Sequence, residues 1–200
     1  MWDLQPTLQG RTVRLEPLAR RHRDGLLAAA SDERIWEHWS FNPARSRQAF
    51  DAWLDGCVAG AAAGGDAHFA TILQATGEPV GSTSFCTIDE QDRGIEIGWT
   101  WLTPAVWGSG VNTEAKFLQL RYAFEVLGAV RVQWDTYATN ARSRAALAKL
   151  GASFEGVLRN YSIRQADGHP VSSAFYSVTD DEWPTVRANL SARIARASGS

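Results

Sequence analysis

The chain has 200 residues, a net charge of −2 and 44% hydrophobic residues. This length predicts a single domain, residues 1–200, with a core large enough to need neither disulfides nor a structural metal. A net charge so close to zero argues against a nucleic-acid partner. No apolar run reaches the roughly 18 residues of a membrane span, and residues 1–4 do not begin a signal peptide. No membrane partner is therefore expected.

The two cysteines, Cys57 and Cys86, are far apart and have no metal-ligand partners at short spacing. They are expected to be buried thiols in a reducing environment, with a disulfide between them as the alternative. The cysteine usage therefore predicts a cytoplasmic location and no metal site.

The first 65 residues are expected to be mainly helical. Residues 12–16 alternate between apolar and polar side chains, which predicts a first strand. Helices are expected over residues 20–30 and 46–62, the second with apolar side chains at helical spacing. Between them, residues 31–34 are expected to cap a second short helix that runs to Trp39.

Three strands follow in series, over residues 68–74, 79–88 and 94–102. The turns between them are too short for helical crossovers, so these strands are expected to be antiparallel neighbours. The later elements expected, in chain order, are a helix over 114–127, a strand over 129–136, a helix over 140–150, a hairpin of strands 153–164 and 170–178, and a helix over 180–194. The predicted fold class is α/β (α+β), with a mixed, mostly antiparallel central sheet flanked by helices. The alternative, a doubly wound parallel sheet, would need helices where the sequence has short turns.

The segment from Trp107 to Ala115 is the strongest local signal of function. It joins a strand to a helix through Gly108 and Gly110, and the first N–H groups of such a helix have no backbone partner. Free N–H groups and the helix dipole together favour an anion, and glycines let a phosphate come close to the backbone. The P-loop lysine and the third glycine of a dinucleotide-binding turn are missing. An ordinary turn before a helix is therefore the alternative.

Seven short blocks spread over nearly the whole chain carry a family resemblance: residues 8–18, 81–83, 95–102, 107–115, 139–143, 149–152 and 155–159. In their order and spacing they resemble the GNAT N-acetyltransferases, and within them the RimJ/RimL-like branch that acetylates protein N-terminal amines. The resemblance implies the GNAT fold, acetyl-CoA as co-substrate and direct transfer of the acetyl group to a primary amine.

The resemblance also implies how acetyl-CoA would be bound. The backbone around the glycine turn would hold the pyrophosphate, the end of the preceding strand would hold the pantetheine arm, and an N–H near Trp101 or Leu102 would polarise the thioester. Two residues depart from the common pattern: Trp107 stands in place of Arg or Gln, and Asn112 in place of a small residue. The residues that we assign to acetyl-CoA on this basis are Trp101, Leu102, Thr103, Trp107, Gly108, Ser109, Gly110, Val111, Asn112, Thr113 and Asn140.

The same resemblance implies Ser143 as the group beside the leaving thiolate. Many relatives have a tyrosine one helical turn later, but that position is Leu147 here, which cannot donate a proton. The alternative is a purely structural role, with Asn140 as the N-cap of a helix and Ser143 as an ordinary residue of its first turn, and this alternative stays open. Serine is a weak acid, so a hydrogen bond to the thiolate or to a water is an alternative to proton donation.

Glu96 is the best candidate for the general base, because it is a single carboxylate in an apolar strand and its pKa would rise on burial. Its alternative role is an ordinary carboxylate that faces water or pairs with Arg93 or Arg131. The next candidates for the base are Asp135 and Tyr137, and a water relay is equally compatible.

The acceptor amine is expected to bind between residues 34–41 and 157–164. The side chains assigned to this acceptor pocket are Trp36, His38, Trp39, Tyr137 and Tyr161. A protein or peptide N-terminus is the predicted acceptor. A small-molecule amine (an aminoglycoside, a polyamine or an amino-acid conjugate) and a non-catalytic acyl-CoA sensor are the alternatives. The oligomeric state is left open, with a homodimer as one option.

Overall fold

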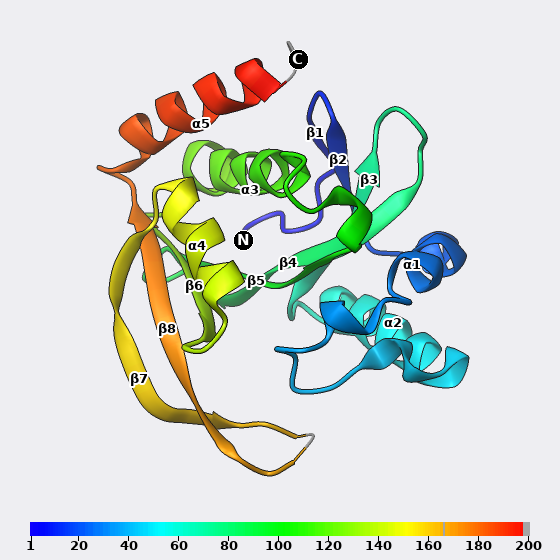
Figure 1. Cartoon of the computed structure of the whole chain (residues 1–200). Coiled ribbons are helices and arrows are strands. Elements are labelled where there is room, and N and C mark those ends of the chain that lie inside the picture. The colour runs from blue at the N-terminus through cyan, green and yellow to red at the C-terminus, as the bar shows by residue number, and fades with distance from the viewer. Residues whose placement is uncertain (166, 198–200) are drawn as a thin grey trace.

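The computed structural model describes residues 1–165 and 167–197, and its strands form a single sheet (Figure 1). The strand order is β1-β2-β3-β4-β5-β6-β8-β7. The strands are β1 (Leu8–Gln9), β2 (Val13–Pro17), β3 (Ala67–Leu73), β4 (Pro79–Asp89), β5 (Gly94–Leu102), β6 (Arg131–Tyr137), β7 (Ser153–Ile163) and β8 (Pro170–Thr179). The β5–β6 pair is parallel, and every other pair is antiparallel. The predicted mixed, mostly antiparallel sheet is therefore confirmed.

In the described residues, five α-helices cover the two faces of this sheet. They are α1 (Arg23–Ala29), α2 (Arg47–Ala62), α3 (Val111–Tyr122), α4 (Ala141–Leu150) and α5 (Trp183–Ala197). Figure 1 shows α1 and α2 together on one side, and α3 and α5 together on the other. The doubly wound alternative is excluded, because β3, β4 and β5 are joined by tight turns as the sequence predicts.

Several predicted boundaries were wrong for local reasons. The short helix expected to run to Trp39 is a single 3-10 turn, Glu33–Ile35, whose N-cap Asp32 accepts the N–H of Arg34. The last helix begins at Trp183 rather than at residue 180. The helix expected over 114–127 begins earlier, at Val111, but it ends at Leu127 as predicted, with a π turn over Ala123–Leu127 after the α-helical part.

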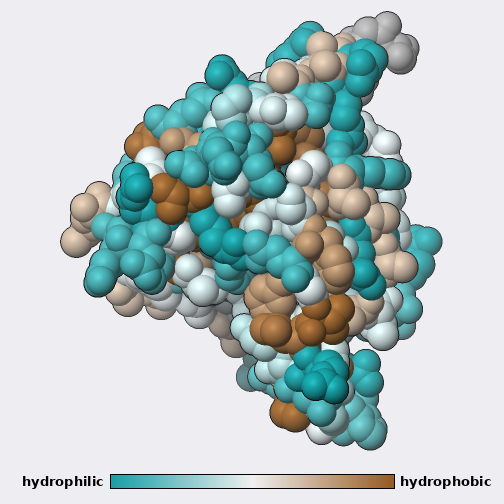
Figure 2. Space-filling model, turned by 90° about the vertical axis from the view of Figure 1, so that its left-hand side faces the viewer, coloured by the Kyte–Doolittle hydropathy of each residue, from teal (hydrophilic) through white to brown (hydrophobic). Residues whose placement is uncertain are grey.

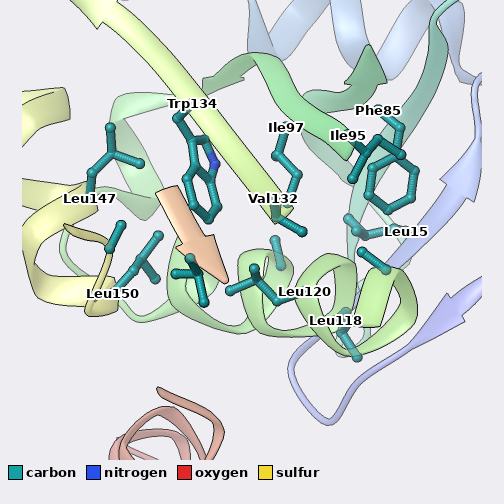
Figure 3. Packing of buried hydrophobic residues seen from close by; sticks show 14 of the residues in the cluster. Leu15, Phe85, Ile95, Ile97, Leu118, Leu120, Val132, Trp134, Leu147 and Leu150 are labelled. Carbon is teal, nitrogen blue, oxygen red and sulfur yellow. The ribbon is translucent and has the colours of Figure 1, made fainter. Parts of the chain in front are cut away.

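The central strands of the sheet are buried on both faces, which accounts for their apolar runs. Along β3, Phe69 belongs to a core with α3, α4 and α5, whereas Ala70 and Ile72 belong to a second core with α1 and α2. Figure 3 shows the first core from close by, with side chains of α3 and α4 lying against those of β5 and β6. This alternation sets which face each residue of β5 presents.

The outer edge of the sheet is β7, where apolar side chains remain exposed. Leu158, Tyr161 and Ile163 keep half or more of their surface. Figure 2 shows apolar residues gathered low on this side of the molecule, over the β7–β8 hairpin.

In the described part of the chain, no helix is long and apolar enough to cross a membrane. Cys57 and Cys86 are free, so no disulfide joins them.

Candidate active site

A glycine turn precedes α3 and leaves donors unused. Gly108 and Gly110 have φ angles of 78° and 89°, a left-handed conformation that favours glycine. Ser109 is held by Val106, whose carbonyl accepts both its N–H and its hydroxyl. Among the described residues, the backbone N–H groups of residues 111–113 have no hydrogen-bond partner. Three donors therefore meet at the positive end of the helix, which is an arrangement that binds anions.

A buried carboxylate anchors this end of α3. Glu114 is 4% exposed, and it accepts the N–H groups of Arg11, Thr12 and Val13 at 2.7, 2.8 and 3.0 Å. A Cβ on Gly10 would lie 2.9 Å from the Glu114 carboxyl carbon, so the turn approaches too closely for a side chain. Sequence analysis missed this role, because an acidic residue in a first helical turn is ordinary.

Two arginines that the sequence did not single out lie beside the glycine turn. The Arg142 guanidinium is 3.9 Å from the centre of the Trp107 ring, and that of Arg34 is 5.6 Å away. The Trp107 indole donates to the Leu102 carbonyl at 2.8 Å, which fixes the ring. Asn112 does not cap the helix, and its Oδ1 is buried without a hydrogen-bond partner among the described residues. Two cations held on one aromatic ring add to the positive potential of the turn.

Strands β5 and β6 separate at this site. Their parallel pairing covers only Gly94–Glu96 with Arg131–Gln133, after which β6 continues beside β8 alone. The edge of β5 beyond Glu96 therefore has no strand partner on the β6 side in the described chain. Its backbone groups are left for a ligand that lies in the gap between the strands.

A bulge in β5 reverses the direction of the side chains that follow it. Ser82 and Ser84 of β4 pair with Trp101 and Gly98, so β5 holds one extra residue in this interval. Trp99 has a φ of 50° there. As a result, Trp101 joins the core on the α1–α2 side, although Ile97 lies in the core on the α3 side. Strict alternation would have placed both on one face.

One cleft, with a volume of about 1270 Å³, joins the glycine turn to the far end of β6. It brings together most of the predicted site residues: Glu96, Trp101, Leu102, Trp107, Gly108, Ser109, Gly110, Asn112, Thr113, Asn140, Ser143, His38, Trp39, Tyr137 and Tyr161. Three predicted residues do not line it. Val111 contributes a buried side chain and a free N–H. The Thr103 N–H is taken by the Val80 carbonyl at 2.8 Å. Trp36 lies in the core.

The start of α4 faces the cleft with one free hydroxyl. Asn140 is the N-cap, and its Oδ1 accepts the Ser143 N–H at 3.0 Å. The capping interpretation of Asn140 is therefore correct, and its side-chain nitrogen is left for a ligand. The Ser143 hydroxyl makes no hydrogen bond to the residues that the structure describes. Leu147, one turn later, is buried in the core and has no group that could donate a proton.

Glu96 is half-buried and forms no ion pair with a cation of the residues that the structure describes. Its carboxylate accepts the side-chain N–H of Gln133 at 3.1 Å, and the Cys86 thiol is 3.8 Å away. Arg131 pairs with Glu155 instead, at 2.5 Å. Burial raises the pKa of Glu96, and the neighbouring carboxylate of Asp135 raises it further. This environment makes Glu96 a stronger base than an exposed glutamate.

The opposite end of the cleft is aromatic and acidic. Trp39 packs on Trp99 with 5.7 Å between ring centres. The Trp99 indole donates to Asp66 at 3.1 Å. Trp36, predicted to bind the acceptor, is 6% exposed, donates to the Ala30 carbonyl and supports Trp39 from behind. Sequence analysis missed Trp99 and Asp66, because nothing in the local pattern shows that the bulge turns this part of β5 toward the cleft.

The chain matches the family described as Acetyltransferase (GNAT) domain over residues 12–153. This chain belongs to the GNAT family of acetyltransferases. The crystal structure of a GCN5-related N-acetyltransferase from Brucella melitensis is 33% identical, with a TM-score of 0.87 over 96% of this chain and 88% of that one. This GNAT chain is also 28% identical to the FsC-acetyl coenzyme A-N(2)-transacetylase of Aspergillus fumigatus, over 90% of this chain and 78% of that relative.

Mycobacterium smegmatis RimJ, solved in complex with CoA-disulfide, shares the fold of this acetyltransferase. Its TM-score is 0.77 at 24% identity, over 95% of this chain and 92% of that one. The GNAT fold implies acetyl-CoA and an acceptor amine as the two substrates. Within the described residues, no group of three or more His, Cys, Asp or Glu side chains could hold a metal ion.

Proposed function

We propose that this GNAT enzyme transfers the acetyl group of acetyl-CoA to a primary amine at a protein or peptide N-terminus, by direct attack without a covalent enzyme intermediate. The observation that carries the proposal is the single cleft that joins the free N–H groups at α3 to the Glu96 carboxylate. An anion site and a base on one continuous surface are what an acyl-CoA and an amine require.

The residues beside the turn fit the charge and shape of acetyl-CoA. Donors on residues 111–113 and the left-handed Gly108 and Gly110 would hold the pyrophosphate. Arg34 and Arg142 would contribute positive charge. The unpaired edge of β5 would bond to the pantetheine arm, with the Asn140 side-chain nitrogen as a further donor. An N–H of the Trp101–Leu102 segment would polarise the thioester oxygen, an assignment that excludes Thr103 because its N–H is already bonded.

Starting from an ammonium, the chemistry requires two protons to leave the nitrogen, one nitrogen–carbon bond to form and one carbon–sulfur bond to break. Glu96 would take the proton of the ammonium directly or through water, with Asp135 and Tyr137 as further candidates. The amine nitrogen would then bond to the acetyl carbon as the carbon–sulfur bond breaks, and the second proton would pass from the nitrogen to the departing sulfur, directly or through water. The Ser143 hydroxyl would hydrogen-bond to the departing thiolate.

The acceptor end supports a cationic amine on an apolar body. Asp66, Glu96 and Asp135 lie along this end of the cleft, and no Lys or Arg of the described chain forms an ion pair with them. Trp39 and Trp99 would pack on the apolar part of the substrate. The resemblance of the sequence blocks to the RimJ/RimL-like branch supports a protein N-terminus as acceptor. A small-molecule amine is the second candidate, because the Aspergillus relative is named as an N(2)-transacetylase of FsC.

A screen of acetyl-CoA consumption tests the proposal. The acceptors are peptides that differ in their first residue and a set of small amines that includes aminoglycosides and polyamines. The free N-terminal amine of a peptide should be acetylated faster than any small amine. Faster turnover of a small amine would favour the second candidate. Tight binding of acetyl-CoA with no turnover by any amine would make the chain an acyl-CoA sensor.

A homodimer is a separate proposal that concerns the exposed edge of the sheet. Leu158, Tyr161 and Ile163 on β7 keep large apolar surfaces, and such patches are common at protein interfaces. Analytical ultracentrifugation would detect the dimer, and Leu158→Asp should shift it toward the monomer.

A further inference from the structure

A lysine is buried beneath the cleft, and none of the chemistry above uses it. Lys116 on α3 is 3% exposed. Its Nζ donates to the hydroxyls of Thr83 and Thr100 at 2.6 and 2.7 Å, and to the side-chain oxygen of Gln119 at 3.1 Å. Three acceptors match the three donors of an ammonium group. The site is therefore shaped for a charged lysine.

Within residues 1–165 and 167–197, this ammonium has no negatively charged partner. Glu114, on the same helix, is occupied by the N–H groups at residues 11–13. On the sheet side the titratable neighbour is Cys86, whose pKa is raised by burial, so the thiol stays neutral. Burial lowers the pKa of Lys116 to about 7. A buried cation held only by neutral oxygens costs stability relative to an apolar side chain, so stability alone does not account for it.

The partners of Lys116 place it at the bulge of β5. Thr100 follows Trp99, the residue with positive φ, and its hydroxyl also donates to the Gly98 carbonyl at 3.3 Å. Thr83 comes from β4 and contacts Thr100 at 2.9 Å. The ammonium therefore ties the bulge of β5 to both α3 and β4.

We propose that Lys116 is a positioning residue for acetyl transfer: its ammonium fixes Thr100 and the bulge of β5, so that the adjacent backbone of Trp101 and Leu102 is aimed at the thioester. This inference rests on the proposed function. Glu114 attaches α3 to the β1–β2 turn at the anion end. Lys116 attaches the same helix to the strand that would hold the reacting group, so one helix sets the distance between the two parts of the cleft.

The test compares two hydroxyl deletions around the same ammonium. Thr100→Val removes the contact at the bulge and should lower kcat about ten-fold or more, with KM for acetyl-CoA changed less than about three-fold, because the anion site is intact. Thr100→Ser keeps the hydroxyl and should restore most of kcat. Thr83→Val, the matched control on β4, should lower the melting temperature comparably but kcat by less than about two-fold.

Lys116→Met should reproduce the kcat defect, and its combination with Thr100→Val should add little to it. Amide hydrogen exchange gives a second readout that needs no substrate: residues 99–102 should exchange faster in Lys116→Met and Thr100→Val, but not in Thr83→Val. If the parent acetylates no amine, the proposed function fails, and hydrogen exchange still decides the role of Lys116. Equal kcat losses in Thr83→Val and Thr100→Val, or unchanged exchange at residues 99–102, would overturn the inference.

Discussion

The two ends of the cleft are built from different parts of the chain. At the anion end, the groups proposed to bind the ligand are free backbone N–H donors on consecutive residues, 111–113, and the buried Glu114 anchors this end of α3. At the acceptor end, the groups proposed to bind the substrate are side chains such as Trp39, Asp66 and Tyr161, which line the cleft and come from segments far apart in the sequence. Ligand binding at the anion end would depend on the backbone conformation, so it should tolerate most changes of side chain. Ligand binding at the acceptor end would depend on the side chains themselves, so it should change when they are substituted. Substitutions should therefore be able to change the choice of acceptor amine without changing the binding of acetyl-CoA.

The largest expected effect is at the anion end. Gly110→Asp places a negative charge at the N-terminus of α3, at a residue with a φ of 89°. We expect acetyl-CoA affinity to fall about a hundred-fold or more, because the charge repels the pyrophosphate. Calorimetry measures the affinity. Gly110→Asn is the control, since asparagine tolerates the same backbone conformation without a charge, and it should lose much less. Equal losses in the two variants would assign the effect to strain.

The next largest effect lies between the two ends, at Glu96. Because burial and Asp135 raise the pKa of this carboxyl, the base is lost as the pH falls through that raised value. Glu96→Gln removes the base at every pH. The loss in kcat, about a hundred-fold, should be greatest just above the pKa of Glu96 and should shrink toward pH 8, where a peptide amine is largely free.

The measurement is the pH dependence of kcat for parent and variant. Asp135→Asn is the comparison, because it removes the neighbouring charge and should move the acid limb of the profile to lower pH. A Glu96→Gln profile that overlays that of the parent would transfer the role of base to Asp135 or Tyr137.

A smaller effect is expected at Ser143. Removal of one hydroxyl from the leaving-group side, in Ser143→Ala, should lower kcat about ten- to a hundred-fold with little change in acetyl-CoA affinity. The Asn140 cap uses the Ser143 backbone N–H, so it survives the substitution. An unaltered kcat, with chemistry shown to be rate-limiting, would leave Ser143 as an ordinary residue of the first turn of α4.

The smallest effect tests whether the acceptor end can be changed alone. Trp39→Ala removes one face of the Trp39–Trp99 pair and should raise KM for the acceptor about three- to ten-fold. KM for acetyl-CoA should not change. Phe41→Ala is the control, because Phe41 contacts Trp39 but does not line the cleft. Parallel changes in both KM values would show that the two ends are coupled.

The sequence by itself determined most of the elements and the glycine turn with free N–H donors before α3, because both depend on local patterns. Alternation and short turns predict β3, β4 and β5, and the spacing of Gly108 and Gly110 before a helix predicts free N–H donors whatever the rest of the chain does. Asn140 as a cap and Leu147 as a residue without a proton to donate follow from the same local information.

Only the tertiary structure decided how side chains are oriented and paired. The bulge at Trp99 turns Trp101 to the opposite face of the sheet, and strict alternation cannot anticipate one extra residue. Trp36 and Trp39 are both tryptophans of one short segment, but Trp36 lies in the core and Trp39 lines the cleft. Glu114 accepts hydrogen bonds from residues about 100 positions away. Lys116 donates hydrogen bonds to Thr83 of β4 and Thr100 of β5. Such contacts depend on which segments the folded sheet brings together, and that information is not present in any short stretch of sequence.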